Sequence, residues 1–77
     1  MLGNVSIHQS SIIEEGAQIG DGTSIGPFCF VGSGVRLGKN VNLKSHVVMK
    51  GNTFLGDDST VFPFSVLGEI PQDKKFN

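Results

Sequence analysis

Residues 19–31 read IGDGTSIGPFCFV, with Ile19, Ile25 and Val31 spaced six residues apart. The spacing continues in both directions, and every sixth position from residue 7 to residue 67 is a large aliphatic residue or Met. These positions are Ile7, Ile13, Ile19, Ile25, Val31, Leu37, Leu43, Met49, Leu55, Val61 and Leu67. An uninterrupted repeat of this length indicates a solenoid, in which each unit packs only on its neighbours.

A second set of positions, two residues before the first, holds small or β-branched side chains. The set runs Val5, Ser11, Ala17, Thr23, Cys29, Val35, Val41, Val47, Thr53, Ser59 and Ser65. Residues two apart on a strand point to the same side, so we expect both sets to face inward with one outward residue between them. Each repeat is therefore a short strand followed by a turn.

Glycines mark the turns. Six of them directly follow a large inward residue, namely Gly20, Gly26, Gly32, Gly38, Gly56 and Gly68. Three others, Gly16, Gly22 and Gly34, recur at a second turn position, where a sharp bend favours a residue that tolerates positive φ. We expect a corner at each of these places.

Three such strands close one triangular coil of about 18 residues, which predicts an all-β fold, a parallel β-helix of about three and a half triangular coils. The coils are expected to occupy residues 1–67. The next inward position after Leu67 is the charged Asp73, and Pro71 does not suit a strand. Residues 68–77 are therefore expected to form a loop that leaves the helix.

Composition excludes several classes of function. The chain has 77 residues, six basic and seven acidic, and a net charge of −1, which gives no electrostatic footprint for nucleic acid. The single cysteine, Cys29, and the absence of an export signal favour the cytoplasm. No apolar run approaches the ~18 residues that a membrane span needs. We predict a cytoplasmic protein that neither binds nucleic acid nor inserts into a membrane.

One outward face differs from the other two. Its outward residues are apolar in every coil, and the adjoining turn column is rich in phenylalanine, whereas the other faces carry mostly polar side chains. A contiguous apolar strip with polar borders usually marks a protein contact, and we predict a homotrimer. The expected interface residues are Ile12, Phe28, Phe30, His46, Val48, Phe64 and Val66.

The sequence predicts no metal site. His8 and His46 are 38 residues apart, whereas two residues on the same corner would be separated by a whole number of coils, here about 36 residues. Cys29 occupies a small inward position, where a buried and unreactive thiol is the usual outcome.

Several stretches of the chain resemble the bacterial acyl-acyl-carrier-protein–UDP-N-acetylglucosamine O-acyltransferases. They are Ile13-Glu14-Glu15-Gly16-Ala17, Ile25-Gly26-Pro27-Phe28-Cys29, Leu43-Lys44-Ser45-His46-Val47-Val48, and Gly68-Glu69 followed by Gln72-Asp73-x-Lys75. The last two are the most restrictive, because isolated six-residue units occur in many transferases. The chain is similar to the N-terminal part of that family.

The resemblance implies a left-handed β-helix that trimerises, with the active site in the cleft between subunits. Such enzymes move an R-3-hydroxyacyl group from acyl carrier protein to the 3-hydroxyl of UDP-N-acetylglucosamine, in lipid A biosynthesis. A histidine serves as general base, and backbone amides stabilise the oxyanion. The family requires no cofactor.

Carried onto this sequence, the resemblance implies that Asp73 hydrogen-bonds the sugar and Lys75 contacts substrate, with Gln72 as a neighbouring polar contact. The family's catalytic histidine belongs to a coil beyond Asn77, so we expect no catalytic residue here and an inactive isolated chain. An alternative is a non-catalytic β-helix assembly module. The related N-acyltransferases carry a domain before their coils, and an ice-binding helix would need a regular outward threonine ladder, which this sequence lacks.

Overall fold

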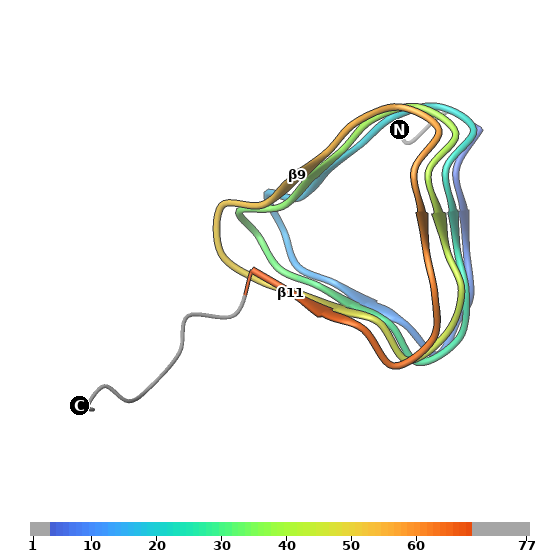
Figure 1. Cartoon of the computed structure of the whole chain (residues 1–77), viewed down its shortest axis with the longest axis vertical. Helices are drawn as coiled ribbons and strands as arrows, with labels where there is room; N and C mark the ends of the chain where they lie inside the picture. The colour runs from blue at the N-terminus through green and yellow to red at the C-terminus, as the bar shows by residue number, and fades with distance from the viewer. Residues whose placement is uncertain (1–3, 69–77) are drawn as a thin grey trace.

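The computed structural model describes residues 4–68, which coil into a triangular parallel β-helix (Figure 1). Short strands lie along its three sides: β1 Ser6–Ile7, β2 Ile12–Ile13, β3 Gln18–Ile19, β4 Ser24–Ile25, β5 Phe30–Val31, β6 Arg36–Leu37, β7 Asn42–Leu43, β8 Val48–Met49, β9 Phe54–Leu55, β10 Thr60–Val61 and β11 Val66–Leu67. The predicted parallel β-helix is confirmed. The left-handed coil remains an expectation from the resemblance.

The strands form three parallel sheets, one on each side of the triangle. Sheet A has the order β1-β4-β7-β10, sheet B the order β11-β8-β5-β2, and sheet C the order β3-β6-β9. Each strand therefore pairs with the strand one coil away, with Ser24 opposite Asn42 and Arg36 opposite Phe54. In residues 4–68 there is no helix, and hence none that could span a membrane.

The two inward sets form the core, as predicted. In the middle coils these side chains are fully buried, for example Val31, Val41 and Met49, each at 0% exposure. At the ends of the helix the same positions, such as Ile7 and Leu55, are only partly buried. The difference arises because, within residues 4–68, the first and last coils have a neighbouring coil on one side only.

The backbone at the second turn position bends through positive φ, even at large side chains. Gly16 and Gly22 adopt it as predicted, but the prediction for Gly34 is wrong; in the next coil of the same corner the positive φ falls on Gly51, one residue before the equivalent position. Five non-glycine residues also have φ between 51° and 64°: Phe28, Asn40, His46, Asp58 and Phe64. Stacking accounts for this geometry, because corner N–H groups donate to the coil below, as His46 N does to Pro27 O over 3.0 Å.

A hydroxyl joins two coils inside the core. Thr23 is fully buried, its Oγ1 donates to Gly38 O over 2.9 Å, and it accepts the N–H of Val41 over 3.2 Å. Ser11 makes the equivalent pair of bonds with Gly26 O and Cys29 N one face away. The small inward positions thus also supply hydrogen bonds where the corners interrupt the backbone ladder.

Replacing Thr23 with Val keeps the shape of the side chain but leaves the Val41 N–H and the Gly38 carbonyl without this partner. We expect the free energy of unfolding to fall by about 1–3 kcal/mol, measured by denaturant titration, because a buried unsatisfied group costs its full desolvation. Thr60→Val, on the exposed outer face of β10, is the matched control and should change stability by less than about 0.5 kcal/mol. Equal effects of the two substitutions would contradict the bridging role.

Candidate functional site

Sheet B presents the apolar face, defined as its outward residues Ile12, Phe30, Val48 and Val66. The register places these residues directly beside one another on β2, β5, β8 and β11. Ile12 is 60% exposed and Val66 57% exposed, whereas Phe30 and Val48 are half-buried. The predicted apolar column is therefore a continuous strip along the helix axis.

An aromatic stack continues this strip at the corner that precedes sheet B. The rings of Phe28 and His46 have centroids 5.1 Å apart at 31°, and those of His46 and Phe64 lie 4.8 Å apart at 22°. Phe28 is 61% and Phe64 77% exposed. Offset or tilted ring pairs at these distances are attractive, so the stack holds three side chains in one column.

Ser10 takes the same place in the first coil. Its Oγ accepts the N–H of Phe28 over 3.0 Å and lies 2.8 Å from His8 Nδ1, which also accepts the Ser10 N–H. His8 is thus held by hydrogen bonds within its own turn. The seven residues that the sequence assigns to the interface do lie on one side of the molecule, and their role there stays a prediction.

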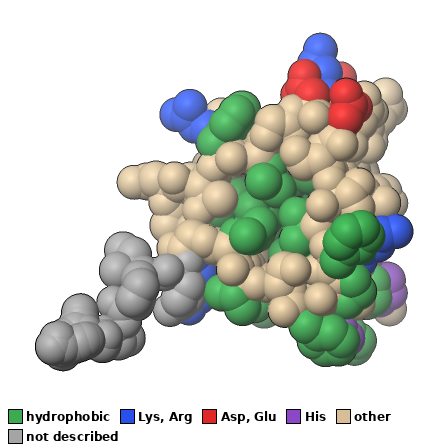
Figure 2. All heavy atoms as spheres, viewed as in Figure 1, with side chains coloured by type: hydrophobic (Ala, Val, Ile, Leu, Met, Phe, Trp, Pro, Cys, Tyr) green, Lys and Arg blue, Asp and Glu red, His purple; other side chains and the backbone are tan. Residues whose placement is uncertain are grey.

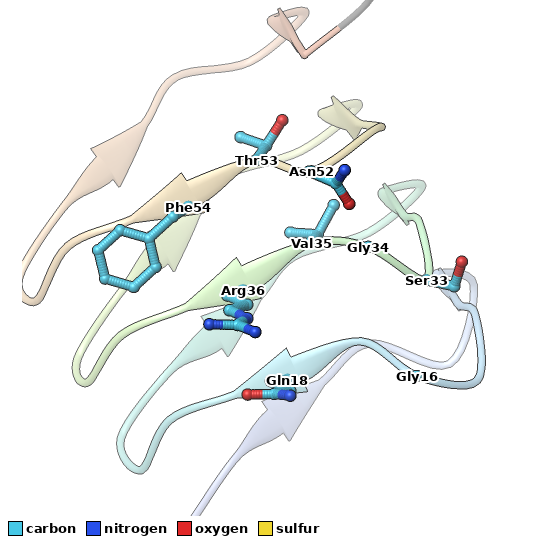
Figure 3. A pocket seen from close by; sticks show the side chains of 9 residues that line it. All are labelled: Gly16, Gln18, Ser33, Gly34, Val35, Arg36, Asn52, Thr53 and Phe54. Carbon is cyan, nitrogen blue, oxygen red and sulfur yellow. The ribbon is translucent and has the colours of Figure 1, made fainter.

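The opposite end of sheet B leads to a glycine-rich corner, formed by residues 14–16, 32–34 and 50–52. A hollow of about 370 Å³ lies between this corner and sheet C. Figure 3 shows Gln18, Arg36 and Phe54 from β3, β6 and β9 side by side along it, with Ser33 and Asn52 at the corner. A second hollow, of about 470 Å³, lies on the sheet B side between Glu14, Phe30 and Lys50.

Polar side chains make up much of the lining of both hollows. The guanidinium of Arg36 makes no hydrogen bond or ion pair within residues 4–68, and the side-chain amides of Gln18 and Asn52 line the same hollow. Glu14 is engaged, because its Oε1 accepts the N–H of Ser33 over 3.1 Å. The sheet C hollow therefore suits a small polar or anionic group. Neither hollow was predicted from the sequence, although the recurrence of glycine, which has no side chain to fill space, is visible at this corner.

The chain reaches Gly68 at the top of this same corner. Lys50 N donates to Leu67 O over 3.0 Å, so the last described residues lie directly above residues 50–51. Gln72, Asp73 and Lys75, the expected substrate contacts, lie outside the described residues, as does nearly all of the expected loop 68–77. The first of them, Gln72, follows Gly68 by four residues in the sequence.

Within residues 4–68 no three His, Cys, Asp or Glu side chains gather where they could hold a metal ion. Cys29 is buried, and its Sγ lies 3.7 Å from Pro27 O. The part of the chain that the structure describes thus offers a contact face and two polar hollows.

Known proteins with similar sequences include a family of bacterial transferases and several of its members. Residues 16–51 match the bacterial transferase hexapeptide family (six repeats). The chain is 65% identical over 72 residues to the acyl-acyl-carrier-protein–UDP-N-acetylglucosamine O-acyltransferase of Anaeromyxobacter sp. (strain Fw109-5), covering 94% of this chain and 28% of that protein. It is 56% identical over 71 residues to the protein of the same name from Verminephrobacter eiseniae (strain EF01-2), covering 92% and 27%.

A solved structure, described as a crystal structure of UDP-N-acetylglucosamine acyltransferase, superimposes with a TM-score of 0.86 at 43% identity. The match covers 94% of this chain and 28% of the crystallised chain. The chain therefore spans about a quarter of the length of the curated relatives it matches.

Proposed function

We propose that this chain, whose residues 16–51 match the bacterial transferase hexapeptide family, supplies the first coils of an acyl-acyl-carrier-protein–UDP-N-acetylglucosamine O-acyltransferase. Such an enzyme transfers an R-3-hydroxyacyl group from acyl carrier protein to the 3-hydroxyl of UDP-N-acetylglucosamine in the cytoplasm, a step of lipid A biosynthesis. The observation that carries the proposal is the identity to the Anaeromyxobacter enzyme along almost the whole of this chain.

In this proposal the chain positions substrate and does not perform the proton transfer. Asp73 accepts a hydrogen bond from a sugar hydroxyl, Lys75 meets a phosphate as a point charge, and Gln72 adds a polar contact. All three follow Gly68 at the glycine-rich corner, whose hollows leave room beside the coils. The general base comes from coils outside this sequence, and the isolated chain is inactive.

The apolar face and the aromatic stack support a homotrimer. A side-by-side arrangement of three helices would cover the exposed Ile12, Phe28, Phe64 and Val66. Cyclic trimers use two different surfaces of each subunit, so the face of sheet B would meet another side of the neighbouring helix. A site between subunits then combines residues after Gly68 in one chain with residues of another.

A chimera tests the proposal. The segment of the Anaeromyxobacter enzyme that matches this chain is replaced by residues 1–77, and acyl transfer to UDP-N-acetylglucosamine is measured. We expect activity within about tenfold of the parent, because a correctly packed segment loses at most about 1.4 kcal/mol of transition-state stabilisation. A chimera that folds and trimerises but transfers no acyl group would contradict the proposal.

Within the chimera, Asp73→Ala and Lys75→Ala are each expected to lower kcat/KM by about 10- to 100-fold. The estimate follows from the loss of a hydrogen bond to a charged group, about 1.5–3 kcal/mol. Asp21→Ala and Lys39→Ala remove the same charges from exposed positions at another corner and should leave kcat/KM unchanged. A uniform loss in all four variants would indicate a structural effect and would contradict substrate contact by Asp73 and Lys75.

The second candidate, a non-catalytic assembly module, is favoured only by the apolar face. It would use the same strip to bind another β-helix. An inactive chimera in which this strip still supports assembly would select that candidate.

A further inference from the structure

The glycine-rich corner lacks a backbone hydrogen bond that the other two corners make. At those corners a turn N–H donates to a carbonyl of the coil below, as His46 N does to Pro27 O over 3.0 Å. The equivalent residues of the glycine-rich corner are Gly34 and Asn52, and neither makes a hydrogen bond within residues 4–68. The carbonyls that they would reach belong to coils that the structure describes. The missing bonds are therefore a property of this corner, whatever follows Gly68.

These two unpaired N–H groups belong to residues that line the sheet C hollow of about 370 Å³. A backbone N–H is an obligatory donor, so without a protein partner it bonds water or a ligand. The neighbouring N–H of Ser33 already donates to a carboxylate oxygen, Glu14 Oε1, over 3.1 Å. Turns that present several such donors are typical anion-binding sites. The backbone of this corner therefore suits an oxyanion.

The side chains of sheet C add a positive charge and further donors. Arg36 lies on the middle strand β6, and its guanidinium makes no hydrogen bond or ion pair within residues 4–68. The register places Gln18 directly beside it on β3, and Figure 3 shows both side chains along the hollow. A guanidinium presents its N–H groups in a planar fork, which matches the two oxygens of a carboxylate or phosphate.

No acidic side chain competes for this guanidinium. None of the residues that line the hollow is Asp or Glu. Figure 2 shows basic and apolar side chains along the side that β9 occupies in Figure 1, whereas acidic side chains gather at the corner that follows it. That corner includes Asp21, Asp57 and Asp58. The charge of Arg36 is thus available to an anion from solution.

Glycine keeps the hollow open. A Cβ on Gly34 would lie 2.7 Å from Asn52 Oδ1 and 2.8 Å from Gly51 O, and one on Gly16 would lie 3.2 Å from Ser33 O. Side chains at either position would therefore compete for the space that a ligand needs.

Phe54 supplies an apolar wall beside the charge. The register places it directly opposite Arg36 on the neighbouring strand β9, and Figure 3 shows its ring along the same hollow. A flat ring can pack against Phe54 while an attached anionic group meets Arg36. The hollow lies within the range of small-molecule sites, which is about 300–1,000 Å³.

We propose that the sheet C hollow binds a small molecule in which an oxyanion, a phosphate or a carboxylate, is attached to a flat ring. The oxyanion accepts hydrogen bonds from Arg36, from the side-chain amide of Gln18 and from the backbone N–H of Gly34, and the ring lies against Phe54. This inference goes beyond the acyltransferase proposal and does not depend on it, because it uses no residue after Gly68.

Amide NMR spectra of the 77-residue chain test the site by titration at constant ionic strength. The probes are phenyl phosphate, benzoate and inorganic phosphate. We expect saturable shifts of the Gly34 and Asn52 signals, with phenyl phosphate binding about 2- to 10-fold more tightly than inorganic phosphate, because it adds a ring contact. Tighter binding of phenyl phosphate than of benzoate identifies the oxyanion as a phosphate, and the reverse order identifies it as a carboxylate.

Three variants assign the contacts. Arg36→Gln should weaken phenyl phosphate binding by about 10- to 100-fold, since hydrogen bonds to charged groups are the strong ones. Lys39→Gln removes the same charge from an exposed position at the next corner and should leave the affinity unchanged. Phe54→Leu should abolish the preference for phenyl phosphate over inorganic phosphate. Dispersed core signals show that each variant is folded, and ligand-detected NMR of the acyltransferase chimera replaces this measurement where the isolated chain gives no dispersed spectrum.

Three results would overturn the proposal. The first is the absence of saturable binding by all three probes. The second is an equal loss of affinity in Arg36→Gln and Lys39→Gln, which would indicate unspecific attraction between charges. The third is a set of saturable shifts centred on another corner of the helix.

Discussion

Gly26→Ala is expected to lower the free energy of unfolding by about 3 kcal/mol or more. A Cβ at this position would overlap the carbonyl oxygen of Lys44 on the next coil and would lie 3.1 Å from Leu43 O. Both obstacles are backbone atoms, which cannot move without separating the coils. Added atoms in a closely packed interior typically cost about 1–3 kcal/mol, and a backbone clash belongs at the upper end of that range.

Gly56→Ala is the matched control, because Gly56 occupies the same position of the repeat. A Cβ there meets no atom of residues 4–68 within 4 Å, and its φ is not in the left-handed region. Its substitution should be neutral or should stabilise by about 0.4–1 kcal/mol through the unfolded chain. Thermal and denaturant unfolding of both variants gives the comparison. Similar losses in the two would mean that the repeat position, and not the neighbouring coil, requires glycine.

Phe30→Glu combined with Val48→Glu is expected to convert the proposed trimer into monomers. Both residues lie in the middle of the apolar face, and both point outward, so a single chain can solvate the new carboxylates without unfolding. In a covered interface each unpaired charge would cost several kcal/mol. Light scattering coupled to size exclusion of the acyltransferase chimera measures the change in mass.

Ser24→Glu combined with Asn42→Glu places the same charges at the same register on sheet A. This pair tests sheet A as the second surface of the contact: the trimer is kept if sheet C or a corner of the neighbour meets sheet B, and is lost if sheet A does. Acyl transfer should fall together with the trimer in the sheet B variant, since the proposed active site lies between subunits. A sheet B variant that keeps its mass would show that the apolar face is not the interface.

Periodicity predicted the core because strand geometry alone determines which side chains share a side. Two inward positions per repeat follow from the alternation of a strand, and Val31, Val41 and Met49 are buried accordingly. The same alternation determines which residues face outward, so the apolar face could be predicted from the sequence alone. The family match confirmed the resemblance.

The corners were harder to predict, because their conformation depends on the coil below and above. Phe28 and Phe64 adopt positive φ although a bulky side chain disfavours it, and Gly34 does not adopt it although glycine permits it. Gly26 and Gly56 occupy equivalent positions in the repeat, yet only Gly26 meets a neighbouring coil closely. The hollows beside the glycine-rich corner likewise arise from stacked coils and not from any one repeat.

The sheet order β1-β4-β7-β10 also has a consequence for the rate at which the chain folds. Each pairing closes a loop of one coil, so the entropic cost of closure is the same at every step and no step must join distant parts of the chain. Ordering can begin at any pair of coils and spread in both directions. During synthesis, a coil can therefore order as it leaves the ribosome, because its only earlier partner was made immediately before it.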